Sequence, residues 1–378
     1  MSYNSIIVDM QRNIEHNPLT LAIVNDFPEN TGIFSYSLNL FKSMLLSSLN
    51  PKMFQFYSGC FNVTEPNIVG VKGISFPTKH SLEINKLTGL NYHFLKNVTG
   101  SFFHFSSPSL YKLVRDKNKS VITLHDLYYL ENYGRSKIMS RYYKKVYFKL
   151  KNGFKISADS EFTKNLALQN LDIDRENIVS VWPGIDLSLY SPLQIEKSPF
   201  DDGTKNITIL HVGYDSPNKN ISTLLDVMFK LPDNFNLIRV GWNSSKTIRK
   251  INQLELGNRV KLLGAISRDK LLSLYTKADM FVFPSTYEGF GIPPIEAMAS
   301  GVPTIVSDVA SLPEVTRGGA LIVSPDSSSI VEGILKIADP TFAKTLILNG
   351  KKVSMKFSLE AQLLRLRRAY KTLIDIDI

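Results

Sequence analysis

Residues 281–303 read FVFPSTYEGFGIPPIEAMASGVP, and this stretch predicts a buried strand, a glycine loop and a helix in direct succession. Pro293 and Pro294 suit the first turn of the helix, because the fixed φ of proline matches that position. The N-terminus of the helix then points into the loop. Its backbone N–H groups and dipole form an anion site, and Gly289 and Gly291 let a phosphate approach the backbone closely. The stretch therefore predicts a site that fits a diphosphate.

Two carboxylates frame this loop. Glu288 stands before it, and Glu296 follows eight residues later, within the first turns of the helix. A carboxylate near a phosphate is unfavourable unless it accepts hydrogen bonds from hydroxyl groups, so the pair indicates a ligand that is both phosphorylated and polyhydroxylated. A nucleotide sugar meets both demands. Taken alone, Glu296 has an alternative explanation as a carboxylate favoured by the helix dipole, and the two glycines are too few for a dinucleotide fingerprint.

The rest of the chain alternates short β-rich runs with longer helical ones, the pattern of βαβ units around parallel sheets. With 378 residues, the chain is long enough for two domains. We therefore predict an α/β fold of two doubly wound domains in tandem. Strands are predicted at 21–24, 54–57, 102–105, 121–124, 155–158, 178–181, 207–212, 237–240, 260–263, 280–283, 304–306 and 320–323. Helices are predicted at 35–49, 137–149, 222–231, 268–277, 294–299 and 359–374.

The boundary between the domains is marked by prolines. Pro183, Pro192, Pro199 and the acidic turn 201–203 indicate a linker. The predicted domains are an N-terminal Rossmann-like domain over 1–185 and a C-terminal one over 186–357. The terminal helix carries apolar residues at helical spacing, and we expect 358–378 to pack back on the first domain. Ligands of such domains bind at the carboxyl ends of the strands, so two facing domains predict a ligand in the central cleft.

Composition excludes several classes of protein. The chain is 43% hydrophobic and 21% charged, as expected of a globular protein rather than a disordered one. Cys60 is the single cysteine, so no intramolecular disulfide forms, and no His–Cys pattern indicates structural zinc. The sequence contains neither an apolar run of about 18 residues nor a signal-peptide pattern at its start. We therefore expect a cytoplasmic protein with no metal and no other cofactor.

The net charge of +10 is concentrated in one segment. Residues 135–155 contain eight Lys or Arg and no Asp or Glu, and Tyr and Phe are interleaved with the cations. Such a helix suits the surface of an anionic membrane, which would place the protein on the inner face of a membrane. An ordinary solvated helix with its aromatic rings in the core is the alternative. Nucleic acid is not expected as a partner, because the sequence contains no nucleic-acid-binding motif.

Taken together, these motifs resemble the retaining GT-B glycosyltransferases of family 4, also called glycosyltransferase group 1. Residues 288–296 match the Glu-x7-Glu signature of that family, and 311–315 continue the match. Residues 31–33 resemble its glycine loop, 123–127 its His-Asp motif, and 211–220 its donor-phosphate loop. The resemblance covers nearly the whole chain. It implies two Rossmann-like domains that face a central cleft.

The resemblance also implies roles for individual residues. Glu296 would bind the nucleotide ribose, Glu288 the donor sugar and Lys219 the diphosphate. His125 would line the acceptor side near the anomeric carbon, although a strand-end histidine bonded to a backbone carbonyl is the alternative. The remaining substrate-binding positions that the resemblance implies are Gly32, Asp126, Gly213, Asn218, Phe290, Gly291 and Ile292.

One departure concerns the cations of the phosphate site. Many relatives have Arg just after the Val-Gly pair or just before the Lys, whereas this chain has Tyr214 and Asn218 there. Either Lys219 carries more of the phosphate charge, or Arg239 or Arg268 substitutes for the missing side chain.

The implied reaction is transfer of a hexose from a nucleotide-diphosphate sugar to a hydroxyl of a glycan or lipid-linked acceptor, with retention at the anomeric carbon. The run 288–299 resembles mannosyltransferases of surface polysaccharide pathways, which favours GDP-mannose as donor. UDP-glucose or UDP-GlcNAc is the alternative donor. An epimerase or a phosphorylase on the same fold is a second alternative, although a phosphorylase would need a pyridoxal-phosphate lysine. From another class, a non-catalytic nucleotide-sugar-binding protein stays open.

Overall fold

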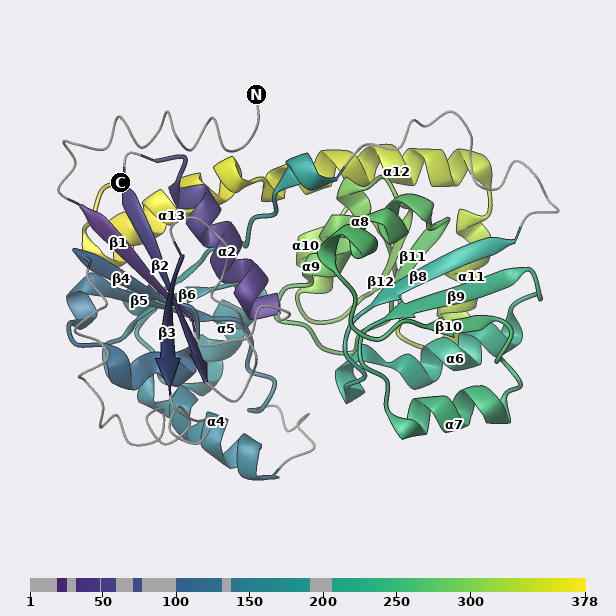
Figure 1. Cartoon of the computed structure of the whole chain (residues 1–378), viewed down its shortest axis with the longest axis horizontal. Coiled ribbons are helices and arrows are strands. Elements are labelled where there is room, and N and C mark those ends of the chain that lie inside the picture. Colours follow the sequence, from purple (N-terminus) through teal and green to yellow (C-terminus); the bar gives the residue numbers. More distant parts are fainter. Residues whose placement is uncertain are drawn as a thin grey trace.

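The computed structural model describes residues 19–25, 32–47, 49–58, 71–76, 100–130, 137–190 and 206–378. Two parallel sheets lie in two separate lobes (Figure 1). The first sheet has the strand order β3-β2-β1-β4-β5-β6-β7 and the second β10-β9-β8-β11-β12-β13. In each sheet the order reverses once, between β1 and β4 or between β8 and β11. The predicted pair of doubly wound α/β domains is confirmed.

The first sheet consists of β1 (Thr20–Asn25), β2 (Asn50–Ser58), β3 (Val71–Phe76), β4 (Phe102–Phe105), β5 (Ser120–Leu124), β6 (Lys155–Ala158) and β7 (Ile178–Ser180). Six of these strands were predicted and β3 was not. Its sequence, VKGISF, has an interior glycine and a lysine, so its strand signal is weak. An edge strand such as β3 pairs on one side only, and such a sequence is tolerated there.

Helices cover both faces of the first sheet. Buried side chains of α2 (Gly32–Met44) and the terminal helix α13 (Leu359–Ile374) share one cluster with β1, while α4 (Lys137–Lys149) and α5 (Glu161–Asn170) pack on the opposite face. The chain therefore returns at its end to the first lobe, as the yellow helix of Figure 1 shows.

The second sheet consists of β8 (Ile207–Val212), β9 (Phe235–Val240), β10 (Val260–Leu262), β11 (Met280–Phe283), β12 (Thr304–Ser307) and β13 (Leu321–Val323). One of its faces carries α8 (Arg268–Lys277), α9 (Ile292–Ala299) and α10 (Leu312–Thr316). The other carries α6 (Ile221–Lys230), α7 (Ser245–Gln253) and α11 (Ser327–Ile337), with the start of α12 (Pro340–Ser354). This alternation produces the three-layer core expected of a parallel sheet buried on both sides.

The predicted helix over 35–49 differs most from the structure, because α2 spans Gly32–Met44. The apolar pattern continues through Leu45 and Leu46, but the chain turns there. The Ser47 hydroxyl donates to the Met44 carbonyl at 2.6 Å and accepts from the Leu49 amide at 3.2 Å. A serine that bonds its own backbone competes with the helix and ends it.

The chain crosses between the lobes at two neighbouring points. The Ile185 amide donates to the Phe357 carbonyl at 2.7 Å, and Ile185 pairs in parallel with Ser358. Of the predicted linker, Pro183 is described, whereas Pro192, Pro199 and the turn 201–203 lie outside the described residues. The two segments that cross between the lobes are therefore joined to each other by backbone hydrogen bonding.

Within the described ranges, no helix has the length and apolar character required to span a membrane.

Candidate active site

The glycine loop between β11 and α9 lies at the point where the strand order of the second sheet reverses. Gly291, with φ of 102°, is the N-cap residue of α9, which starts at Ile292. Because Pro293 and Pro294 have no N–H, the amides of Gly291 and Ile292 are those that this end of the helix can present to an anion. Ser311 holds the loop by donating to the Glu288 and Phe290 carbonyls, at 3.0 and 2.9 Å.

Lys219 and Glu288 form an ion pair at this loop. The Lys219 Nζ lies 2.5 Å from Glu288 Oε1, and the two side chains are only 17% and 12% exposed. Burial at this level strengthens the interaction of both charges with a ligand. The two residues that the sequence assigned to diphosphate and sugar therefore lie in direct contact.

Asn218, expected to bind substrate, lies in the loop 213–220 between β8 and α6, here called the phosphate loop, and links it to the glycine loop. Its side-chain amide donates to the Tyr287 carbonyl at 2.9 Å, and its own carbonyl accepts from the Thr286 amide at 2.7 Å. These bonds fix Lys219 next to the glycine loop. The structure therefore gives Asn218 a positioning role.

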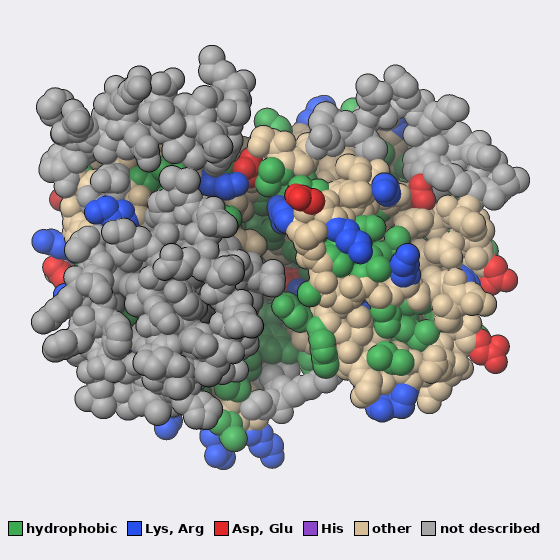
Figure 2. Space-filling model, viewed as in Figure 1, with side chains coloured by type: hydrophobic (Ala, Val, Ile, Leu, Met, Phe, Trp, Pro, Cys, Tyr) green, Lys and Arg blue, Asp and Glu red, His purple; other side chains and the backbone are tan. Residues whose placement is uncertain are grey.

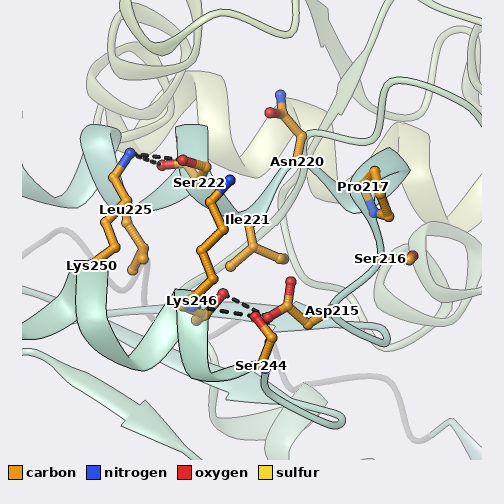
Figure 3. A pocket seen from close by; sticks show the side chains of 11 residues that line it. Asp215, Ser216, Pro217, Asn220, Ile221, Ser222, Leu225, Ser244, Lys246 and Lys250 are labelled. Atoms are coloured by element: carbon orange, nitrogen blue, oxygen red, sulfur yellow. Dashed lines mark hydrogen bonds between the residues drawn. The ribbon is translucent and has the colours of Figure 1, made fainter. Parts of the chain in front are cut away.

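A pocket of about 380 Å³ lies between the phosphate loop, the start of α6 and α7 (Figure 3). Inside it, the Asp215 carboxylate accepts from the Ser244 amide at 2.8 Å and the Thr247 hydroxyl at 2.6 Å. Burial alone would raise the pKa of Asp215, but these hydrogen bonds lower it. The ionised Asp215 therefore anchors the phosphate loop to the start of α7.

Glu296 lies in the first turns of α9 and is only 4% exposed. Its Oε1 accepts from the Tyr190 hydroxyl at 2.7 Å and from Arg268 at 2.8 Å, and its Oε2 accepts from the Tyr275 hydroxyl at 2.9 Å. Sequence reasoning missed both tyrosines, although Arg268 and Tyr275 lie seven residues apart on one face of α8. A carboxylate offers about four acceptor sites, so these donors leave about one for a ribose hydroxyl.

The two arginines considered as phosphate ligands are engaged elsewhere. Arg268 bonds Glu296, and Arg239 has no exposed surface. Arg239 donates to the carbonyls of Gly213 and Trp242, at 3.0 and 2.9 Å, and so binds together the ends of β8 and β9. Of these three cations, Lys219 is therefore the one that the structure places against the glycine loop.

His125 follows β5 and has both ring nitrogens bonded within the first domain. Its Nδ1 lies 2.7 Å from Asp159 Oδ2, and its Nε2 lies 2.6 Å from the Ser106 carbonyl. Burial lowers the pKa of His125, but the charge and hydrogen bond of Asp159, together with the Ser106 carbonyl and the charge of Asp126, raise it above its ordinary value. The geometry matches an imidazolium that donates a hydrogen bond from each ring nitrogen. One of these bonds is the contact with a backbone carbonyl that the alternative interpretation of His125 predicted.

The sequence analysis gave Asp159 no role, although Asp159 follows β6, the strand beside β5. Carboxyl ends of neighbouring parallel strands meet at one edge, which could have indicated the pair with His125. Asp126, the next residue after His125, accepts from the Tyr128 amide at 3.0 Å. Burial raises the pKa of Asp126, and the nearby carboxylate of Glu288 adds to the effect.

The two domains meet at Gly289. A Cβ at this position would lie 1.9 Å from the His125 carbonyl oxygen, so only glycine fits. Across the interface, the Ser160 hydroxyl donates to the Gly289 carbonyl at 2.7 Å, and the Tyr287 hydroxyl accepts from the Leu127 amide at 3.0 Å. These contacts bring the predicted acceptor side and the predicted donor side together, and Figure 2 shows the surface hollowed between the lobes.

Glu314 adds a second link between the domains. Its carboxylate accepts from the amides of Glu161 and Phe162, at 2.8 and 3.0 Å, and from the Trp182 indole at 2.8 Å. A carboxylate from the second domain thus caps the first turn of α5 in the first domain, where the helix dipole favours negative charge. The sequence analysis had matched Glu314 to a motif without giving it a role.

The remaining predicted positions lie around this interface. Gly32 is the first residue of α2, and Tyr36, one turn later, packs edge-on against the His125 ring with centroids 4.9 Å apart. Gly213 follows β8 directly. The Phe290 side chain is buried in the core against Phe357, so only its backbone can face a ligand.

In the described part of the chain, no three His, Cys, Asp or Glu side chains are grouped so that they could hold a metal ion. The arrangement instead offers one lysine, two backbone amides and a helix N-terminus to an anion, and carboxylates to hydroxyl groups. Such a set suits a phosphorylated carbohydrate.

Comparisons with known proteins agree with this geometry. Residues 194–353 match the family model described as "Glycosyl transferases group 1". The chain is 32% identical to the O-antigen chain mannosyltransferase RfbU of Salmonella typhimurium, over 57% of this chain and 59% of that protein. It is 30% identical to an uncharacterised glycosyltransferase of Methanocaldococcus jannaschii, over 68% of this chain and 69% of that protein.

A solved structure is similar over nearly the whole chain. HepE of Anabaena, in complex with UDP and glucose, superimposes with a TM-score of 0.76 at 19% identity, over 94% of this chain and 100% of that chain. The structural likeness extends to both lobes, whereas the sequence match spans little more than half of RfbU.

Proposed function

Because this chain belongs to the glycosyl transferases group 1 family, we propose that it transfers a hexose from a nucleotide-diphosphate sugar to a hydroxyl group, with retention at the anomeric carbon. The observation that carries the proposal is the Lys219–Glu288 pair beside the N-terminus of α9. It provides a cation for the diphosphate and a carboxylate for the sugar at one place, opposite His125.

In the proposed mechanism the enzyme stabilises the leaving group. Lys219 and the amides of Gly291 and Ile292 would bind the departing diphosphate, whose negative charge grows as the bond to the anomeric carbon breaks. Glu288 would accept hydrogen bonds from sugar hydroxyls. We expect His125 to act as a fixed cation near the acceptor rather than as a proton donor, since both of its nitrogens are already bonded.

Retention follows from attack on the face that the leaving group vacates. The acceptor oxygen bonds to the anomeric carbon, the bond from that carbon to the phosphate oxygen breaks, and the acceptor proton passes to the departing phosphate oxygen. A covalent route through a carboxylate is the alternative for a retaining enzyme.

GDP-mannose is the proposed donor, supported by the similarity to RfbU, whose printed name is mannosyltransferase. UDP-hexoses are the second candidate, since HepE was crystallised with UDP and glucose. The test is a panel of GDP-mannose, UDP-glucose and UDP-GlcNAc, measured by thermal stabilisation and by release of the nucleoside diphosphate. Stabilisation by none of the three would contradict the proposed function, and stabilisation without release would favour a binding protein.

Glu296→Gln should weaken the binding of the nucleoside diphosphate by about 1.5 to 3 kcal/mol, the range for a hydrogen bond to a charged group. Glutamine keeps the size of the side chain, so Tyr190, Tyr275 and Arg268 retain a partner. Calorimetric titration with GDP and with ribose-free guanine measures the effect. If the variant binds GDP as the wild type does, Glu296 does not contact the ribose.

Activity should survive an excess of EDTA. The proposed site neutralises the phosphate charge with Lys219, loop amides and the α9 dipole, and none of these depends on a metal ion. Nucleoside-diphosphate release from the preferred donor is measured with and without chelator. Loss of activity that magnesium or manganese restores would contradict the expectation.

We further propose that α4 docks the first domain on an anionic membrane that carries a lipid-linked acceptor. Its outward face exposes cations together with large apolar side chains: Ile138 is 78% exposed and Phe148 48%. Figure 2 shows basic side chains at the lower edge of the first lobe, where Figure 1 places α4. Exposed apolar side chains among cations favour a membrane over a simple solvated helix.

The wild type should therefore sediment with anionic vesicles at low salt, and little with neutral ones, because each Lys or Arg at the surface adds about 1 kcal/mol that salt screens. Replacing the exposed residues Arg141, Lys145 and Lys149 by Glu should abolish sedimentation. The matched control replaces exposed lysines of the second domain by Glu, at Lys261, Lys277 and Lys344. If both triple variants lose sedimentation equally, binding to the vesicles depends on the net charge of the protein and not on α4.

A further inference from the structure

His211 is buried without a hydrogen-bond partner. It has no exposed surface, and within the described part of the chain neither of its ring nitrogens has a partner. A buried polar group that forms no hydrogen bond destabilises the folded protein by about 1–3 kcal/mol. A ligand that forms a hydrogen bond with the imidazole would remove this cost.

The imidazole belongs to the second-last residue of β8 and lies beside Gly213, where the phosphate loop begins. A Cβ at Gly213 would lie 3.6 Å from His211 Cε1 and 3.4 Å from Cδ and Cε of Lys219. The imidazole edge and the lysine stem therefore meet over the same glycine. The ring also stacks on Phe283 of β11, with centroids 6.0 Å apart and planes 21° apart. His211 thus occupies the junction of β8 and β11, where the strand order reverses.

Burial and the neighbouring positive charges favour the neutral form of His211. Burial lowers its pKa well below the ordinary value, the charges of Arg239 and Lys219 lower it further, and Asp215 acts in the opposite direction. A neutral imidazole carries one N–H donor and one acceptor nitrogen. Both are unused here, and the donor suits an anion whose oxygens can only accept.

We propose that His211 is a further ligand of the donor diphosphate. When Lys219 turns from Glu288 to a phosphate, its stem leaves the space over Gly213, and the His211 N–H donates to a phosphate oxygen. The assignment rests on the proposed function, since it requires that a nucleoside diphosphate binds at Lys219. It gives this chain a second phosphate donor besides Lys219.

The experiment compares His211→Phe and His211→Gln with the wild type. Phenylalanine preserves the stacked ring and removes the N–H, so affinity for GDP and UDP should fall about tenfold or more, while affinity for guanosine and uridine stays unchanged. The melting temperature should not fall, because an unsatisfied polar group has been removed. Glutamine retains an N–H donor and should restore most of the affinity.

His104→Phe is the matched control, since His104 is equally buried but has both ring nitrogens bonded, to Tyr370 at 2.7 Å and to Thr123 at 2.6 Å. It should lower the melting temperature and leave nucleotide affinity unchanged, the reverse of His211→Phe.

A spectroscopic readout covers the case in which His211→Phe fails to fold. The chain has six histidines, so their ring ¹⁵N resonances can be followed in the wild type as GDP is added. The resonance that is missing from the spectrum of His211→Gln is that of His211, and in the wild type it should shift as GDP is added. If the wild type binds GDP but neither this resonance nor the affinity of the variants changes, the proposal is overturned. If the wild type binds no nucleoside diphosphate, the proposed function itself fails.

Discussion

Lys219→Met should lower the turnover of the preferred nucleotide sugar about 100- to 1,000-fold. This is the typical loss when one preorganised hydrogen-bond donor to a developing negative charge is removed from an active site. The expected effect is large because Arg239 and Arg268 are both committed to other groups. The methionine preserves the apolar stem and removes the ammonium group, whose Nζ lies 4.8 Å from the centroid of the Phe283 ring. Steady-state release of the nucleoside diphosphate measures kcat and KM.

Lys261→Met controls for the loss of a positive charge, because Lys261 is exposed on β10, away from the proposed site. Its turnover should equal that of the wild type. If Lys219→Met retains more than about a tenth of the wild-type kcat, another cation neutralises the diphosphate, and the assignment of Lys219 is wrong.

Glu288→Gln should lower turnover about 10- to 100-fold and spare the affinity for the nucleoside diphosphate. The expected loss corresponds to hydrogen bonds between a charged carboxylate and sugar hydroxyls. In the structure Glu288 also holds Lys219 through a 2.5 Å ion pair, so removing its charge releases the lysine. Affinity for free GDP should therefore stay equal or increase, whereas affinity for the whole nucleotide sugar falls.

The ion pair makes the two substitutions non-additive, which a double-mutant cycle measures. In the variant with both Lys219→Met and Glu288→Gln, the loss of turnover should be smaller than the sum of the two single losses in free energy. Additive losses, or a fall in GDP affinity in Glu288→Gln equal to that in Lys219→Met, would contradict the division of roles between sugar and phosphate.

The sequence predicted most elements of the fold, and several with their bounds. Local pattern suffices where an element is buried and continuous, because burial requires an unbroken apolar run or stripe. The elements with the predicted bounds are β4, β6, β8, β11, α4, α8 and α13. The sequence analysis failed at β3, an edge strand with a glycine, and at the end of α2, where a serine hydroxyl stops a helix that the apolar pattern continues. It also gave no range for α5, α7, α10, α11 and α12.

The candidate site, too, was predicted in part from the sequence and decided in part by the tertiary structure. Residues 281–303 by themselves indicated the anion site, because a strand, a glycine loop and a helix N-terminus are determined by neighbours in sequence. Only the tertiary structure decided which groups these residues face: Glu288 faces Lys219 across 69 positions, Glu296 faces Tyr190 across 106, and Glu314 caps a helix 153 positions away. Such partners depend on how two sheets and two domains pack, and the side-chain pattern of one segment carries no record of that packing.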